Sequence, residues 1–183
     1  MPDRRQVMAG GLLGCALGAL PAQAAQMIHI DDAAILIGNG FADGVLFLDG
    51  CGQAVRAGQC DVAITALAGG GFSTPRVIAI AQQSDAFPLQ QFLIAERYRP
   101  VFSAEHLRSA GWIEHRLQGN AALVRAVAAG LSRTGANWAS ALALTLRRPG
   151  LSFSEAGLVQ KVATPAHAGP AFLSSFLFER IPA

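Results

Sequence analysis

Three short segments made almost entirely of apolar residues constrain the fold more than any other feature of the sequence. GVLFLDG at 44–50 closes with Asp-Gly, DVAITAL at 61–67 is soon followed by three glycines, and PRVIAIA occupies 75–81. Strands that do not alternate polar and apolar residues are buried on both faces, as is typical of a parallel sheet between helices. These segments therefore predict an α/β protein with a parallel sheet covered by helices.

The second half of the chain changes to helical spacing. Apolar and small residues recur every three or four positions between Leu107 and Ala128, after Ser103, which can cap a helix. A later segment begins at Asn137, ends in two arginines and is followed by Pro-Gly, all of which favour a helix. Helices are therefore predicted over residues 88–100, 103–130 and 137–148. The middle one is expected to be scaffold, with Trp112 packed in the core.

The C-terminal tail returns to strand-like segments. GLVQKVA at 157–163 and AFLSSFLFER at 171–180 flank the loop TPAHAGP, which is rich in Pro and Gly. Two strands around such a loop predict a C-terminal β-hairpin. The order of strands, then helices, then a hairpin predicts a single α/β domain.

The first two dozen residues have the composition of an export signal. Arg4 and Arg5 precede an apolar core, and Pro21 and the sequence Ala-Gln-Ala at 22–24 then predict cleavage after residue 24. The core is too short to span a membrane, which takes about 20 apolar residues. We expect a soluble periplasmic protein, exported by a signal that loosely resembles the twin-arginine type; a lipid anchor at Cys15 is the alternative. The remaining residues, 25–183, number 183 − 24 = 159, enough for one domain.

Charge and cysteine content narrow the partners and the compartment. The formal charge of +2 falls to +1 when the signal is removed, and there is no basic run, so neither nucleic acid nor an anionic membrane surface is indicated. Cys51 and Cys60 are close in sequence, and an oxidising compartment favours a disulfide between them. A redox or metal role would need C-x-x-C spacing or a histidine cluster, and the sequence has neither.

Several segments resemble a known family. RTGANWASALALTLRR and LSFSEAGLVQKVATPAHAGPAFLSSFLFER resemble the C-terminal end of type 1 periplasmic solute-binding proteins of ABC importers, the leucine/isoleucine/valine-binding group. ADGVLFLDGCGQAV resembles a strand and turn of the second lobe of that family, and the resemblance covers about residues 42–180. It implies one lobe of a periplasmic-binding-protein-like fold and solute binding for uptake or sensing. The family has two lobes and this chain is about half as long, so half of the usual ligand contacts have no counterpart.

Four residues are predicted to contact a solute at strand ends. Asp49 and Gln53 follow the first apolar segment, and Ser73 and Thr74 follow the second. Open α/β sheets bind ligands at the carboxyl ends of their strands, and Asp49 could receive an amino group there. The alternative for both places is an ordinary turn. The glycine-rich segment has neither the Lys of a phosphate-binding loop nor the spacing of a dinucleotide site.

No motif in the sequence indicates catalysis. The four histidines are His29, His106, His115 and His167, and no two have zinc-ligand spacing on one helix. There is no G-x-S-x-G segment, no paired-acid motif and no Cys-His arrangement, so no enzyme, cofactor or metal is predicted. The function predicted is an exported, non-catalytic binding protein for a small polar solute, an amino acid or organic acid. The alternative is an exported accessory protein that binds a protein partner and has lost the solute cleft.

Overall fold

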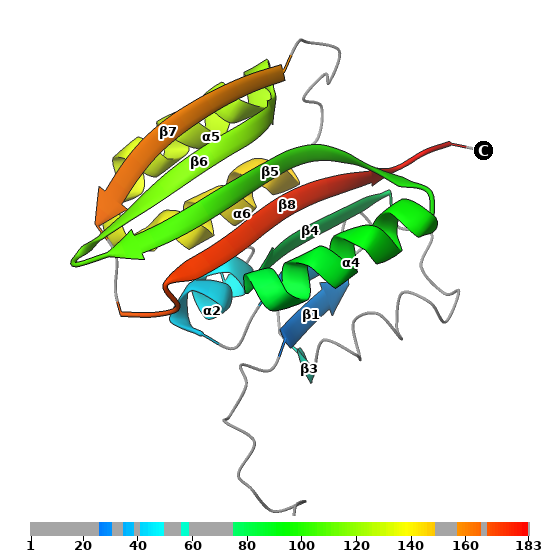
Figure 1. Ribbon diagram of the computed structural model, residues 1–183, viewed down its shortest axis with the longest axis horizontal. Coiled ribbons are helices and arrows are strands. Elements are labelled where there is room, and N and C mark those ends of the chain that lie inside the picture. Colours follow the sequence, from blue (N-terminus) through cyan, green and yellow to red (C-terminus); the bar gives the residue numbers. More distant parts are fainter. Residues whose placement is uncertain are drawn as a thin grey trace, which may run out of the picture.

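The computed structural model describes residues 26–30, 35–38, 41–49, 56–58, 75–148, 157–165 and 168–182, which form one eight-stranded sheet with helices on both faces (Figure 1). The order of strands across the sheet is β3-β1-β2-β4-β8-β5-β6-β7. The strands are β1 (Gln26–Ile30), β2 (Ile35–Gly38), β3 (Arg56–Gly58), β4 (Arg76–Ala81), β5 (Tyr98–Ser109), β6 (Trp112–Asn120), β7 (Gly157–Pro165) and β8 (Phe172–Arg180). The helices are α2 (Ala42–Asp49), α4 (Gln83–Ala95), α5 (Ala121–Thr134) and α6 (Trp138–Arg147), with a 3₁₀ turn, η1 (Gly135–Asn137), before α6.

The predicted fold, a parallel sheet covered by helices as in one lobe of a periplasmic-binding-protein-like fold, is wrong. Of the strand pairs in the described residues, only β2–β4 is parallel, and the other six pairs are antiparallel. The strand β4 is buried on both faces, as its apolar sequence predicts, but it lies between the parallel β2 and the antiparallel β8. Burial on both faces therefore arises here from helices on either side of a mainly antiparallel sheet.

Two apolar cores lie on opposite faces of the sheet. Ile78 and Ile80 of β4 join the larger core, which also takes side chains from α2, α5 and α6. Val77 and Ala79 of the same strand point the other way, into a smaller core under α4. Alternate residues of a strand point to opposite faces, which explains how one short strand serves both cores.

Of the segment predicted as the first strand, 44–50, residues 44–49 lie in the helix α2. Its buried residues are Asp43, Gly44, Phe47 and Leu48, and this spacing defines one face of a helix. A short apolar run does not by itself distinguish a buried strand from a buried helix. The strand was therefore predicted from a pattern that fits both elements. The segment 61–67, predicted as the second strand, lies outside the described residues.

The long helix predicted over 103–130 is instead a β-hairpin followed by a helix. β5 and β6 pair in antiparallel register around a turn at Ala110-Gly111, where Gly111 supplies a positive φ of 78° at the second turn position. The helix α5 begins only after Asn120, whose side-chain oxygen accepts hydrogen bonds from the backbone N–H groups of Ala122 and Leu123 at 3.0 and 3.2 Å. Gly130, the predicted end, lies inside α5. Trp112, predicted to be in the core, is 54% exposed.

The remaining predictions were correct in part. α6 confirms the helix predicted over 137–148, and α4 replaces the one predicted over 88–100, beginning five residues earlier and ending at Ala95. Both C-terminal strands are present as β7 and β8, but they do not pair with each other. β7 pairs with β6, and β8 lies between β4 and β5, so the predicted C-terminal hairpin is wrong. The closing strand is inserted into the middle of the sheet.

Candidate functional site

Of the four residues predicted to contact a solute, the structure describes one. Asp49 is exposed and is the last residue of α2, so the reason for placing it at the end of a strand no longer holds. Its role as a ligand stays a prediction. Outside the described residues lie Gln53, Ser73 and Thr74, the predicted disulfide partners Cys51 and Cys60, and His167.

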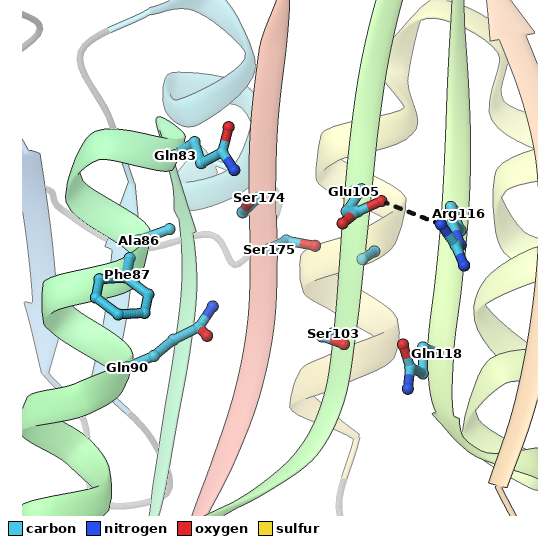
Figure 2. Close-up of a pocket in the computed structure, with 11 residues that line it drawn as sticks. Gln83, Ala86, Phe87, Gln90, Ser103, Glu105, Arg116, Gln118, Ser174 and Ser175 are labelled. Atoms are coloured by element: carbon cyan, nitrogen blue, oxygen red, sulfur yellow. Dashed lines mark ion pairs between the residues drawn. The ribbon is translucent and has the colours of Figure 1, made fainter.

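A pocket of about 320 Å³ opens between α4 and the strands β8, β5 and β6 (Figure 2). It lies on the face of the sheet opposite α2, α5 and α6. The helix α4 contributes Gln83, Ala86, Phe87 and Gln90, and the strands contribute Ser103, Ala104, Glu105, Arg116, Gln118, Ser174 and Ser175. Most of these residues carry hydrogen-bonding groups, and Phe87, which is 66% exposed, adds an apolar surface.

The secondary structure explains why these side chains converge. The four α4 residues are spaced at i, i+3, i+4 and i+7 and therefore share one face of the helix. Opposite them, Ser103 pairs with Gln118 and Glu105 pairs with Arg116 in the register of β5 and β6. Directly opposed residues of an antiparallel pair project from the same face of a sheet. The pocket thus has a wall made by α4 and a floor made by strands.

Two opposite charges stand side by side on this floor. The closest guanidinium and carboxylate atoms of Arg116 and Glu105 are 3.9 Å apart, and both side chains are just over half exposed. An exposed ion pair of this kind contributes about 0–1 kcal/mol, so a ligand can separate the two groups at little cost. The neighbouring cation, Lys161 on β7, makes a closer ion pair of 2.9 Å with Glu114, outside the pocket lining.

The covered face of the same two strands carries a buried polar cluster. His106 of β5 and His115 of β6 are directly opposed, both 0% exposed, and their Nδ1 atoms are 2.7 Å apart. The Nε2 atom of His106 is 2.8 Å from the hydroxyl of Ser175 on β8. The Nε2 atom of His115 is 2.8 Å from the hydroxyl of Thr164 on β7. A hydrogen-bonded row therefore crosses four adjacent strands inside the larger core.

Trp138 of α6 covers this row. Its ring centroid lies 4.7 Å from that of His106 and 4.8 Å from that of His115, and the side chain is fully buried. Its indole Nε1 has no hydrogen-bond partner in the part of the chain that the structure describes. The indole ring of Trp138 thus packs against both imidazoles and shields them from water.

Burial determines the protonation of the two histidines. Burial, and then the positive charge that His115 would carry, hold the pKa of His106 well below its ordinary value of 6.5. Burial, and then the guanidinium of Arg108, lower the pKa of His115 from 6.5 to about 4. Both rings are therefore neutral at neutral pH, and one Nδ1 donates to the other.

The cluster contains a serine hydroxyl hydrogen-bonded to a histidine, which is the geometry of a nucleophile and its base. Nucleophilic attack requires a substrate carbonyl at the hydroxyl oxygen, but Ser175 has no exposed surface. Its hydroxyl points into the core and away from the pocket, although the residue lines the pocket floor. Within the described ranges, no group of three or more His, Cys, Asp or Glu side chains could hold a metal ion.

Sequence reasoning missed both sites because it assigned a helix to this region. One signal was available: His106 and His115 lie four residues before Ala110 and four after Gly111, the symmetrical positions of a hairpin with a two-residue turn. Once the hairpin is known, the opposition of Glu105 and Arg116 follows from the same count. Phe102, Ala104 and His106 also alternate with polar residues at the period of a strand.

Comparison with known proteins gives no family. No family model matches the chain, and no curated protein and no solved structure is similar to it. Among the helices that the structure describes, none has the length and apolar character to cross a membrane.

Proposed function

We propose that this protein binds a small polar solute bearing a carboxylate, an amino acid or organic acid, in the pocket beside α4, and does not change it chemically. The observation that carries the proposal is the pair Glu105 and Arg116, the two charged residues of the pocket lining, beside the uncharged polar side chains of Ser103, Gln118 and Ser174. The proposal keeps the class of function predicted from the sequence and moves the site to other residues.

The chemistry of the lining favours such a solute. A guanidinium binds a carboxylate through two parallel N–H···O bonds, so Arg116 would hold the acid group. The carboxylate of Glu105 would accept hydrogen bonds from an ammonium group where the solute has one. The amides of Gln83, Gln90 and Gln118 can donate to or accept from the rest of the molecule.

The size of the pocket limits the solute. A volume of about 320 Å³ lies at the low end of the range of roughly 300–1,000 Å³ found for ligand sites. A single amino acid or a short organic acid suits this space. The exposed ring of Phe87 at the rim would contact an apolar part of the solute.

The partners and location that accompany this proposal come from the sequence. A periplasmic protein in uptake or sensing would meet its solute after export, and an ABC permease or another exported protein would receive the loaded form. These assignments are part of the proposal.

A thermal-unfolding screen of the purified protein against the common amino acids and a set of di- and tricarboxylic acids tests it. A solute at 100 times its Kd adds about 2.7 kcal/mol to the free energy of unfolding and raises the midpoint by several degrees. For a solute that does so, titration calorimetry should show Arg116→Gln weakening binding about 10- to 100-fold, because a charged hydrogen-bonding group is lost.

The matched control is Lys161→Gln. Lys161 lies beside Arg116 in the strand register, is exposed, and does not line the pocket. Its removal changes the net charge by the same amount and should leave the affinity unchanged. The proposal is overturned if no compound shifts the midpoint, or if both substitutions weaken binding equally. The protein-partner alternative would then be preferred, and the exposed side chains of Leu107, Trp112 and Val159 would be the first to test.

A further inference from the structure

The buried histidines and the two charged residues of the pocket occupy consecutive residue pairs of the β5–β6 ladder. His106 pairs with His115 and Glu105 pairs with Arg116, and consecutive residues of a strand point to opposite faces of the sheet. The histidines therefore lie directly behind the pocket floor. Whatever holds β5 to β6 on the covered face also holds the two pocket charges together on the other.

Few charges act on the histidine pair. β8, β7 and α6 present Ser175, Thr164 and Trp138 to it, and none of these groups titrates near neutral pH. The buried residues of α5 are all apolar. On the same face, Arg108 is two residues along β5 and forms an ion pair with Asp43 of α2. Glu105 and Arg116 face the pocket side.

The number of protons on the two rings determines whether the hydrogen bond between His106 and His115 can form. The Nδ1–Nδ1 contact of 2.7 Å needs one ring with a hydrogen on Nδ1 and one without. A first added proton leaves a charge in the apolar core under Trp138, and a second places two N–H groups head to head. Opening the ladder exposes both rings to water, where each takes up a proton readily. Acid therefore favours the open ladder over the closed one.

We propose that the His106–His115 pair is an acid-sensitive latch, which holds β5 to β6 at neutral pH and releases this ladder in acid, so that Glu105 and Arg116 separate. The consequence for the solute rests on the function proposed above, whereas the latch itself does not. A solute bound across both strands would leave when they part, and would resist their parting while bound.

The opening is expected in this part of the sheet for a structural reason. β4 and β8 are covered by α4 on one face and contribute to the larger core on the other. On the pocket face of β5, β6 and β7, the side chains of Leu107, Trp112 and Val159 are about half exposed. Elements with fewer buried contacts open locally at lower free energy than the rest of a fold.

Amide hydrogen exchange at pH 7.5 and pH 5.5, corrected for intrinsic rates, measures the opening directly. Each ring has a pKa near 6.5 when exposed and well below 5.5 when buried. Lowering the pH from 7.5 to 5.5 therefore raises the equilibrium constant for opening about 10-fold for each histidine that becomes exposed, and about 100-fold for two. We expect β5–β6 amides to show the larger figure and, at both pH values, to exchange faster than β4–α4 amides, which exchange only when the whole sheet unfolds. Ordinary carboxyl groups, with a pKa of about 4.3, stay ionised throughout.

Substitution of the histidines, and spectra that report their tautomers, test whether the pair causes the pH dependence. His115→Gln should reduce the change to about 10-fold, and His106→Gln with His115→Gln should abolish it. If the variants do not fold, nitrogen-detected imidazole spectra of the unmodified protein at pH 7.5 should show two neutral rings of opposite tautomer. Equal opening of β5–β6 at the two pH values, equal protection of β5–β6 and β4–α4 amides at pH 5.5, or two identical tautomers would each overturn the latch.

A second arm separates this inference from the proposed function. The exchange experiment is repeated with each amino or organic acid that raises the unfolding midpoint, at 100 times its Kd. Each should slow opening of β5–β6 about 100-fold at either pH, because the solute must leave first. Absence of any binding compound overturns the proposed function and leaves the latch standing. A bound compound that does not slow the opening overturns the coupling.

Discussion

The Nδ1 atoms of His106 and His115 face each other at 2.7 Å across the β5–β6 ladder, inside an otherwise apolar core. The Nε2 atom of His106 hydrogen-bonds the hydroxyl of Ser175 on β8, and the Nε2 atom of His115 hydrogen-bonds the hydroxyl of Thr164 on β7. Every ring nitrogen in the pair thus has a partner while both rings are neutral. The arrangement specifies the register of four strands at once, because a slip by one residue would place both imidazoles on the opposite face.

This pair makes global stability depend on pH. Both folded-state pKa values lie below the ordinary 6.5, so the unfolded chain binds more protons between about pH 6.5 and pH 4. Their contribution to stability is therefore complete above pH 6.5 and is lost as the pH falls below it. For His115 alone the shift from 6.5 to about 4 corresponds to roughly 3 kcal/mol lost by pH 4. Urea denaturation at a series of pH values measures it, and a flat profile from pH 7 to pH 5 would contradict it.

Trp138 is predicted to be the most sensitive single core position around the pair. It is fully buried against both imidazoles, so Trp138→Ala should reduce the free energy of unfolding by about 3–5 kcal/mol. Trp138→Phe keeps an aromatic plate and removes an N–H that has no partner among the described residues, and should cost clearly less. Urea denaturation of the two variants gives the comparison; equal losses would show that the indole N–H is satisfied.

The parts of the fold that sequence predicted correctly are those with strong local signals. β4 was found because five successive residues, Val77 to Ala81, are apolar, and α6 because Asn137 precedes it and arginines and Pro149 close it. These signals come from neighbours in sequence, which act in the same way in most folds. Whether a strand pairs in parallel or antiparallel depends on residues far along the chain, and no pattern in the residues of β4 indicates it.

The β5–β6 hairpin was missed because two periods coexist in one stretch. Leu107, Ala110 and Glu114 fit a helical spacing, whereas His106, Ile113 and His115 fit strand alternation on the buried face. Gly111 in the turn favoured the hairpin, and the strand pattern won because it buries both histidines with partners. The candidate site could not be predicted without this pairing, since Glu105 and Arg116 meet only through it.

The ion pair between Asp43 and Arg108 should contribute far more than any ion pair on the surface. The two side chains are 2% and 9% exposed, and Arg108 also donates through Nε to the carbonyl of Pro170 at 3.1 Å. Asp43→Asn leaves a buried guanidinium without its counter-charge and should cost about 3–5 kcal/mol. The control Glu114→Gln breaks the exposed pair with Lys161 and should cost less than about 1 kcal/mol. Chemical denaturation of both variants decides; equal costs would show that burial adds nothing to this contact.

A close backbone approach makes Gly119 irreplaceable in β6. A Cβ atom there would lie 2.5 Å from the carbonyl oxygen of Val101 on β5, and the φ of 151° is one that side chains disfavour. Gly119→Ala should therefore cost at least about 2 kcal/mol, because only backbone movement relieves the clash. Gly111→Ala is the matched control: its φ is also positive, at 78°, but nothing lies within 4 Å of the added atom. It should cost about 1 kcal/mol, from the conformational preference alone. Urea denaturation of the pair separates steric contact from backbone preference, and a smaller loss for Gly119→Ala than for Gly111→Ala would contradict the close approach of the two strands.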